Sequence, residues 1–558
     1  MQKACRQCQA TFEITDDDLA FLEKVSPVFA GKKELIPPPT MCPECRMQQR
    51  MSWRNHHHVY RHASRSKEHA GFGMWTPDSP FPSYENTYWF SDAWDPYASQ
   101  QDVDLSVPFF PQFLSVHNRA PHFALDNVQM ENSAFCNNAD NVKNCYLCFN
   151  ASQSEDCITC DNVYDCNDCL DCTRVFACER CLDCIDCERC YELQNAQHCE
   201  NCSNSAFLLH CRSCSNCLGC VNMRHREYCV FNEQKTPQEY AEFVRTMALD
   251  TKSGRQAFSK KFQAFSLQYP TPHTVMRMAD GCTGNYLTHC NDVHNSTFVH
   301  SAEHLHNCQF LSDGADNCRD VTLFGVRVSH CYEGCIMGLD AYQSHFCVSV
   351  WEGTSNMLYC SFCVACSDCF GCTGLHRKHY CILNKQYTKE EYEDLVPRII
   401  IHMRSTGEWG EFFPITGSPV PYNHTLAQQY FPLSKQQVEA LGGRWLEKTI
   451  PEAAQAIEAN DLPDGLPQTD EAIIVKSERS GRPFKITSQE IKRYRQFRVP
   501  LPRLTYDERM EDRARILGGI HLYDRTCAKT GKPIKTTIPP ESPWIVWDRD
   551  AWEKECGS

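Results

Sequence analysis

Cysteine spacing constrains the fold of this chain more than any other feature of its sequence. Twenty cysteines lie between Cys136 and Cys229, and all of them fall in the same phase of a three-residue count. Many of them also recur at a period of 21, as Cys145, Cys166 and Cys187 do. A fixed period of about 20 to 25 residues is typical of a solenoid, in which successive coils stack on one another. We therefore predict a β-solenoid with about 21 residues per coil.

The solenoid pattern occurs twice in the chain. Residues 211–229 match residues 363–381, cysteine for cysteine, at a constant offset of 152. Each copy is followed by a capping box, which begins at Thr236 in the first and at Thr388 in the second and marks a helix start. A helix at that place would cover the unpaired backbone groups at the open end of a β-solenoid. The sequence therefore predicts a mainly β protein with two solenoid halves, each followed by a capping helix.

Two C-x2-C pairs near the N-terminus form the strongest candidate metal site. They are Cys5 with Cys8 and Cys42 with Cys45, the second pair written CPEC. Four thiolates in two such pairs suit tetrahedral zinc, which gains from a closed shell of sulfur ligands. Free thiols or a rubredoxin-like iron are the alternatives. We predict one structural zinc ion, held in a zinc-ribbon module.

The two ends of the chain form a second duplication. Residues 37–89 align with residues 500–552 without a gap, and the segment that begins at Ala10 matches one that begins at Arg482. The C-terminal end is therefore predicted to be a second ribbon-like module. Five parts follow from these repeats: an N-terminal ribbon module at 1–118, solenoid halves with their helices at 119–268 and 269–408, a linker or docking segment at 409–470, and the C-terminal module at 471–558.

Only one of the four predicted ribbons keeps its cysteines. The positions that match the four N-terminal cysteines are Ser477, Ser480, Thr505 and Glu508. The second ribbon of each module is also incomplete, with Ser64, Lys67, Glu85 and Tyr88 in one and Cys527, Thr530, Asp548 and Ala551 in the other. Zinc is not expected at these three places, where packing alone must maintain the fold.

The cysteines of the solenoid halves are weaker metal candidates. The predicted coil would stack their C-x2-C pairs in columns, so that two adjacent tiers offer four sulfur atoms. Three interpretations stay open: stacked thiols without a ligand, zinc ions that join neighbouring coils, or iron–sulfur clusters. The candidate ligands are Cys145, Cys148, Cys166, Cys169, Cys187 and Cys190 in one column, Cys157, Cys160, Cys178, Cys181, Cys199 and Cys202 in the other, and Cys211, Cys214, Cys363 and Cys366 beyond them.

Several motifs resemble those of a known family. They are IPPPTMCPECRMQQRMSWRN in the N-terminal module, WFSDAWD at Trp89, the paired YCVFN and YCILN, and GEWGEFFP at Gly407. They are similar to motifs of an uncharacterised family of cysteine-rich zinc-ribbon proteins from uncultivated small-genome bacteria, and the resemblance covers essentially the whole chain. It implies pairs of four-cysteine ribbons at both ends, of which this chain keeps the first. It implies no activity.

Composition bounds the environment and the partners of the protein. The 558 residues include 70 acidic and 55 basic side chains, and the net charge of −15 opposes nonspecific binding to nucleic acid or to anionic membranes. No apolar stretch approaches a membrane span, and the first residues lack the apolar run of a secretory signal. We expect a soluble, cytoplasmic protein with reduced thiols. An oxidised extracellular protein is the alternative.

Three functions compete at this stage, and none of them is supported by a catalytic motif. The leading hypothesis is a noncatalytic zinc-binding scaffold that binds another protein, with Trp409, Phe412 and Phe413 as a candidate docking segment. The second is binding of RNA or DNA by the basic ends, in which Arg493 and Arg495 would contact phosphates. The third is redox chemistry along the cysteines, through thiol exchange or an iron–sulfur cluster.

Overall fold

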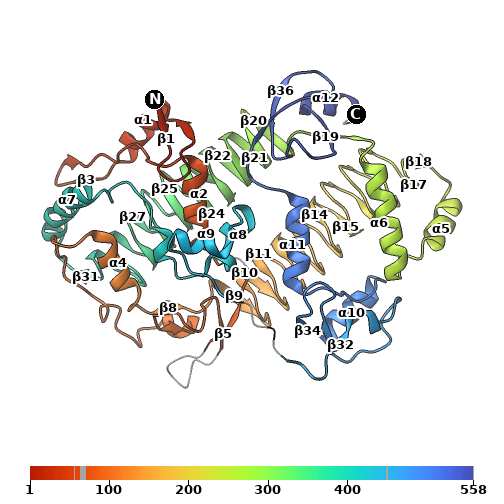
Figure 1. Cartoon of the computed structure of the whole chain (residues 1–558), viewed down its shortest axis with the longest axis horizontal. Helices are drawn as coiled ribbons and strands as arrows, with labels where there is room; N and C mark the ends of the chain where they lie inside the picture. Colours follow the sequence, from red (N-terminus) through yellow and green to blue (C-terminus); the bar gives the residue numbers. More distant parts are fainter. Residues whose placement is uncertain (56, 63–70, 448–449, 451, 557–558) are drawn as a thin grey trace. The chain divides into compact units, whose positions relative to one another are not determined.

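The computed structural model of the chain describes residues 1–55, 57–62, 71–447, 450 and 452–556. The chain is mainly β and divides into two compact units. Unit 1 comprises Met1–Leu125 with Val275–Leu446, and unit 2 comprises Asp126–Thr274 with Glu447–Ser558. Each unit therefore joins one solenoid half to the module from the far end of the chain. Figure 1 shows this exchange in its colours, with red beside green in one unit and yellow beside blue in the other.

The solenoid is confirmed, but its coils repeat at a step of 12 in the first half, and the predicted step of 21 is wrong. Parallel strands β11 (Phe149–Ser152), β12 (Asp161–Tyr164) and β13 (Thr173–Phe176) pair with Phe149 opposite Asp161 and Asp161 opposite Thr173. Strands β9 (Asn127–Glu131), β10 (Asn137–Lys143) and β14 (Ile185–Glu188) complete this sheet, and β15 (Tyr191–Gln194) pairs with β16 (Ser203–Ala206). Both 12 and 21 are multiples of three. A chain of similar tripeptides matches itself at either spacing, so sequence alone does not separate them.

A tripeptide is the structural unit of each coil. Its first residue pairs with neighbouring coils, its second has a positive φ, and its third points inward. In one such unit, Tyr146 donates to the carbonyl of Cys157 (3.0 Å), Leu147 has φ 53° and donates to the carbonyl of Ala134 (3.1 Å), and Cys148 is buried. The left-handed conformation costs a non-glycine residue about 1 kcal/mol, which the backbone ladder and the packed interior must offset. Four tripeptides close one coil of the first half.

Cysteine suits the inward position because a thiol is small and can both donate and accept weak hydrogen bonds. The Sγ atom of Cys160 accepts from the backbone N–H of Cys172 on the next coil (3.4 Å). The thiol of Cys148 donates to the carbonyl of Cys157 (3.3 Å). Ser154 fills the same role, since its Oγ accepts from the N–H of Cys166 (3.2 Å). The interior therefore has a structural use for cysteine that does not depend on metal.

The second half repeats this design with longer coils and fewer cysteines. Leu287 of β21 (Gly284–His294) lies opposite Val299 of β22 (Ser296–His306), a step of 12, whereas Thr322 of β24 (Ala315–Gly325) lies opposite Cys335, a step of 13. Strands β20 (Met276–Asp280), β23 (Gln309–Ser312), β25 (Tyr332–Gly338), β26 (Val348–Trp351) and β28 (Ser361–Val364) belong to the same sheet, beside β27 (Ser355–Leu358), β29 (Ser367–Phe370) and β30 (His379–Ile382). Leucine and valine replace many of the inward cysteines.

Helices follow each half where the capping boxes predict them. Helix α5 (Pro237–Thr246) begins after Thr236 and α7 (Lys389–Thr406) after Thr388, each with both capping-box hydrogen bonds. In unit 2, α6 (Lys252–Ser266) follows α5 and buries Phe258 against the solenoid (Figure 1). No helix among the described residues combines the length and apolar character that a membrane span needs.

Candidate metal centre and its metal-free counterparts

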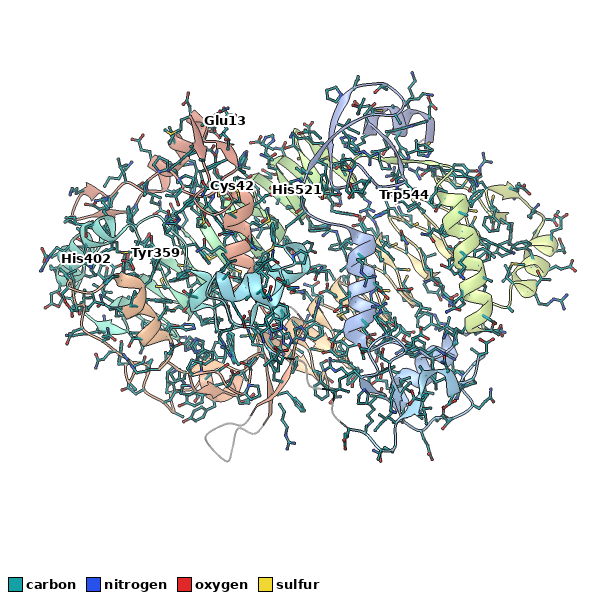
Figure 2. The ribbon with its side chains drawn as sticks, in the orientation of Figure 1. Glu13, Cys42, Tyr359, His402, His521 and Trp544 are labelled. Carbon is teal, nitrogen blue, oxygen red and sulfur yellow. The ribbon has the colours of Figure 1, made fainter. Side chains whose placement is uncertain are left out.

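The four N-terminal cysteines meet between a hairpin and a helix. Cys5 and Cys8 lie in the turn between β1 (Gln2–Ala4) and β2 (Thr11–Glu13), while Cys42 caps α2 (Pro43–Met51) and Cys45 lies in its first turn. Figure 2 labels Cys42 at this end of the helix. All four Sγ atoms lie within 4.8 Å of one another. We refer to them as the thiol tetrad.

The geometry of the thiol tetrad fits a tetrahedral metal ion. Sulfur ligands at about 2.3 Å from such an ion would lie about 3.8 Å apart, and the Sγ atoms of Cys8 and Cys42 are 3.7 Å apart. Cys5, Cys42 and Cys45 are buried, whereas Cys8 is exposed. With four protein ligands, the shell leaves no open position for a substrate or a water molecule.

Hydrogen bonds favour negative charge on two members of the thiol tetrad, Cys5 and Cys42. A hydrogen bond with the thiol of Cys45 lowers the pKa of Cys42 to about 5, and the same contact raises the pKa of Cys45. Burial opposes ionisation of Cys5, but the backbone N–H groups of Cys8 and Cys42 outweigh it, so that the pKa of Cys5 is lowered. Cys42 also stands at the N-terminus of α2, where the helix dipole favours an anion.

Helix α2 is anchored to the solenoid of unit 1 through two buried arginines. Arg46 contacts Asp320 and Glu333 (both 2.7 Å), and Arg50 contacts Glu333 (2.5 Å) and Thr322 (3.3 Å). The two acids occupy like positions on adjacent coils, one above the other. Burial raises the pKa of Asp320 to about 6 although Arg46 opposes the shift. The thiol tetrad therefore fixes the start of a helix whose next two turns are held by ion pairs.

The same anchor occurs in unit 2. Arg509 and Arg513 on α11 (Tyr506–Leu517) contact Asp171 at 2.7 and 3.3 Å, and Arg513 also contacts Thr173 (2.9 Å). These arginines match Arg46 and Arg50 at the same offset of 463 that relates the two ends of the chain. We did not predict either pair of arginines from the sequence, although the alignment of the two ends places the two pairs at matching positions.

A carboxylate takes the place of the thiol tetrad at the start of α11. The matched residues Ser477, Ser480, Thr505 and Glu508 are indeed brought together. The Oε2 atom of Glu508 accepts hydrogen bonds from Ser477 Oγ (2.6 Å), Thr505 N (2.8 Å) and Thr505 Oγ1 (3.1 Å). Burial opposes its ionisation, but the hydroxyls of Ser477 and Ser480 outweigh burial and lower the pKa of Glu508. Hairpin β33 (Ile473–Lys476) with β34 (Pro483–Ile486) completes this ribbon without metal.

A second carboxylate organises the last ribbon of the chain. Asp548 precedes α12 (Arg549–Cys556) and accepts from Thr530 Oγ1 (2.7 Å), Cys527 Sγ (3.1 Å) and the N–H of Ala551 (3.0 Å). The Thr530 hydroxyl is the main cause that lowers the pKa of Asp548 to about 2. The ribbon hairpin is β35 (Tyr523–Thr526) with β36 (Pro533–Thr536).

The matching ribbon of the N-terminal module is described only in part. Ser64 and Lys67 lie outside the described residues. Glu85 caps α3 (Asn86–Trp89) by accepting from the N–H of Thr87 (2.9 Å), and Tyr88 is half-buried in that helix.

The shorter coil changes the expected grouping of the solenoid cysteines. Cys145 contacts Cys157, not the predicted Cys166, because the sheet register places neighbours on adjacent coils at a step of 12. The candidate ligands of the first half fall in four columns: Cys145, Cys157, Cys169 and Cys181; Cys148 and Cys160; Cys166, Cys178, Cys190, Cys202 and Cys214; and Cys187, Cys199 and Cys211. All of these, with Cys363 and Cys366 of the second half, are buried. Within the described residues, the thiol tetrad is the sole group of three or more His, Cys, Asp or Glu side chains that lie close enough together to hold a metal ion.

The residues proposed for macromolecular contacts make internal contacts. Arg493 pairs with Asp168, and Arg495 pairs with Asp470 (2.7 Å). Of the candidate docking segment, Trp409, Phe412 and Phe413 are all buried in unit 1.

Comparison of the chain with protein-family models and with curated proteins finds no match.

Proposed function

We propose that the protein is a noncatalytic scaffold in which one zinc ion stabilises unit 1, and that its solenoid faces bind another protein. The thiol tetrad at the start of α2 carries this proposal. A closed shell of four thiolates suits zinc and is typical of a structural site. The ion would hold α2 in the position where Arg46 and Arg50 reach their acidic partners. A reducing cytoplasm would keep the thiols available for metal.

Metal content per chain tests the zinc site. On protein purified without oxygen, we expect one zinc ion per chain and no visible colour. The variant Cys42→Ser with Cys45→Ser should lose that ion, whereas the control Cys527→Ser should keep it. Iron with sulfide and visible absorption would instead favour the redox alternative. Several zinc ions would favour ions that join neighbouring coils.

Burial of the solenoid cysteines favours a packing role over redox chemistry. The cysteines from Cys136 to Cys229 are all buried, whereas reactive thiols are partly exposed. In the second half, burial also raises the pKa of Cys308 and that of Cys335 to about 12.

Nucleic-acid binding is tested by retention of single-stranded RNA and duplex DNA at low salt. The scaffold proposal expects no retention, because the net charge is −15 and both candidate arginines already have acidic partners. Retention that falls steeply with salt would instead favour nucleic-acid binding. In that case retention should disappear in the double variant Arg493→Glu with Arg495→Glu.

A further inference from the structure

The two units differ beside their anchored helices. In unit 1, the space next to α2 is filled by residues 407–414, which we name the aromatic segment. Phe413 of this segment packs on Trp53, with ring centroids 5.1 Å apart, and Gln49 donates to the carbonyl of Phe413 (2.9 Å). A side chain at Gly410 would meet Pro37 at 2.5 Å. The aromatic segment therefore touches Pro37, Gln49 and Trp53.

The residues of unit 2 that match these three line a cavity instead. At the offset of 463, Pro37, Gln49 and Trp53 correspond to Pro500, Asp512 and Ile516. All three of the latter line a cavity of about 290 Å³, whose walls come from unit 2 alone. Ile516 is 48% exposed, whereas Trp53 is 1% exposed. The volume is close to the lower end of the range for ligand pockets, about 300 to 1,000 Å³, and suits a small molecule.

Two opposite charges at this cavity, Arg255 and Asp183, are joined through an asparagine instead of a direct ion pair. Arg255 donates to Gln194 Oε1 (2.9 Å), to the carbonyl of Leu249 (3.3 Å) and to Asn195, which are all neutral. Asp183 accepts from Asn195 Nδ2 (2.6 Å). Within the described residues, no ion pair within 4.0 Å involves either charge, so that Asn195 is the link between them.

Both side chains are half-buried, and desolvation favours the neutral form of each, although the two charges attract each other and Arg509 and Arg513 also attract Asp183. Desolvation lowers the pKa of Arg255 to about 10 and raises the pKa of Asp183. Arg509 and Arg513, in the same cavity wall, differ from Arg255 because each forms a direct ion pair with Asp171. A ligand that supplied an anion to Arg255 and a cation to Asp183 would give each charge a direct partner and would offset the cost of desolvation.

We propose that this cavity binds a small zwitterion of the α-amino acid type. The carboxylate would contact Arg255, the ammonium group would contact Asp183, and an apolar side chain would lie against Val499, Leu504 and Ile516. An anion alone would leave Asp183 without a direct ion-pair partner, and a cation alone would leave Arg255 without one. This site does not depend on the thiol tetrad, because all its residues belong to unit 2.

Calorimetric titration of the full-length, metal-loaded protein tests the proposal with four probes. L-leucine carries both charges, leucinamide lacks the carboxylate, 4-methylpentanoate lacks the ammonium group, and inorganic phosphate is a simple anion. We expect L-leucine to bind, and each of the other three to bind at least about tenfold more weakly, since each loses a charged hydrogen bond. If 4-methylpentanoate or phosphate bound as tightly as L-leucine or more tightly, the proposal of a zwitterionic ligand would be wrong. Failure of L-leucine and of the other standard amino acids to bind at millimolar concentration would overturn the site.

Two variants that each remove one charge locate the binding. Arg255→Gln and Asp183→Asn should each weaken L-leucine binding at least about tenfold. The control Arg189→Gln, whose side chain pairs with Glu188 outside the cavity, should bind as the unaltered protein does. Undiminished binding by a folded Arg255→Gln variant would place the ligand elsewhere. If a variant does not fold, the order of the four probes on the unaltered protein still decides, and metal content is measured separately.

Discussion

The two units solve one structural problem with different chemistry. Both place a helix on a solenoid half through two arginines one helical turn apart, Arg46 and Arg50 in unit 1, Arg509 and Arg513 in unit 2. At the start of the helix, unit 1 has four thiols, whereas unit 2 has the carboxylate of Glu508 with its hydroxyl donors. Each ribbon therefore gathers its hairpin and its helix start around side chains that can carry negative charge. In unit 1, these side chains could also hold a metal ion.

The largest expected effect separates the units by their need for metal. Cys42→Ser with Cys45→Ser should destabilise unit 1 by several kcal/mol, because binding of structural zinc contributes about 10 to 16 kcal/mol in small zinc domains. Unit 2 should keep its stability, since its centre is a carboxylate. Limited proteolysis with identification of the cut sites measures both units in one sample. Equal sensitivity of the two units would contradict the comparison.

Loss of an anchoring arginine should cause the next largest loss of stability. The loss should be of similar size in both units. Arg50→Ala leaves the buried Glu333 with Arg46 as its remaining partner, and removal of one member of a buried ion pair costs up to about 3 to 5 kcal/mol. Arg513→Ala is the matched change in unit 2. Urea unfolding followed by hydrogen exchange of each unit gives the two free energies of unfolding. The exposed Arg398→Ala, near Asp394 on α7, is the control and should change stability little.

Substitution inside the solenoid should have a smaller effect and should distinguish packing from metal binding. Cys160→Ala removes the acceptor for the N–H of Cys172, and an unsatisfied buried group costs about 1 to 3 kcal/mol. Cys160→Ser keeps an acceptor and should cost less. Thermal unfolding measures both variants. Loss of metal from either variant, by elemental analysis, would show that the solenoid cysteines are ligands.

The smallest expected effect is a loss of stability at acid pH in the last ribbon. Hydrogen bonds lower the pKa of Asp548 from 3.8 to about 2 in the folded protein. Because the folded value is the lower one, the carboxylate stabilises the ribbon above pH 3.8 and loses that contribution as the pH falls towards 2. Hydrogen exchange of 523–556 between pH 5 and pH 2 should show this loss. In Asp548→Asn the dependence should be weaker, and an unchanged pH profile would exclude Asp548 as its origin.

Spacing in the sequence was sufficient for the thiol tetrad, the repeated halves and the helix starts. The coil length could not be predicted from the spacing, because tripeptides of similar composition align at a step of 12 as well as at a step of 21. That error also hid the anchors: Asp320 and Glu333 lie one above the other only when the coil step is 13. The roles of Glu508 and Asp548 depend on hydrogen-bond geometry. The loss of cysteines from these two ribbons does not predict that geometry. The resemblance to a cysteine-rich family remains a prediction.

The most direct test of the account is hydrogen exchange of α2 and α11 in the same sample, with and without a zinc chelator under reducing conditions. We expect chelation to remove protection from α2 and the β1–β2 hairpin and to leave α11 protected, because Glu508 holds the start of α11 without metal. Restoration of zinc should restore α2. Full protection of α2 in metal-free protein, or equal loss in both helices, would contradict the claim that a thiolate-bound ion in unit 1 replaces the carboxylate of unit 2.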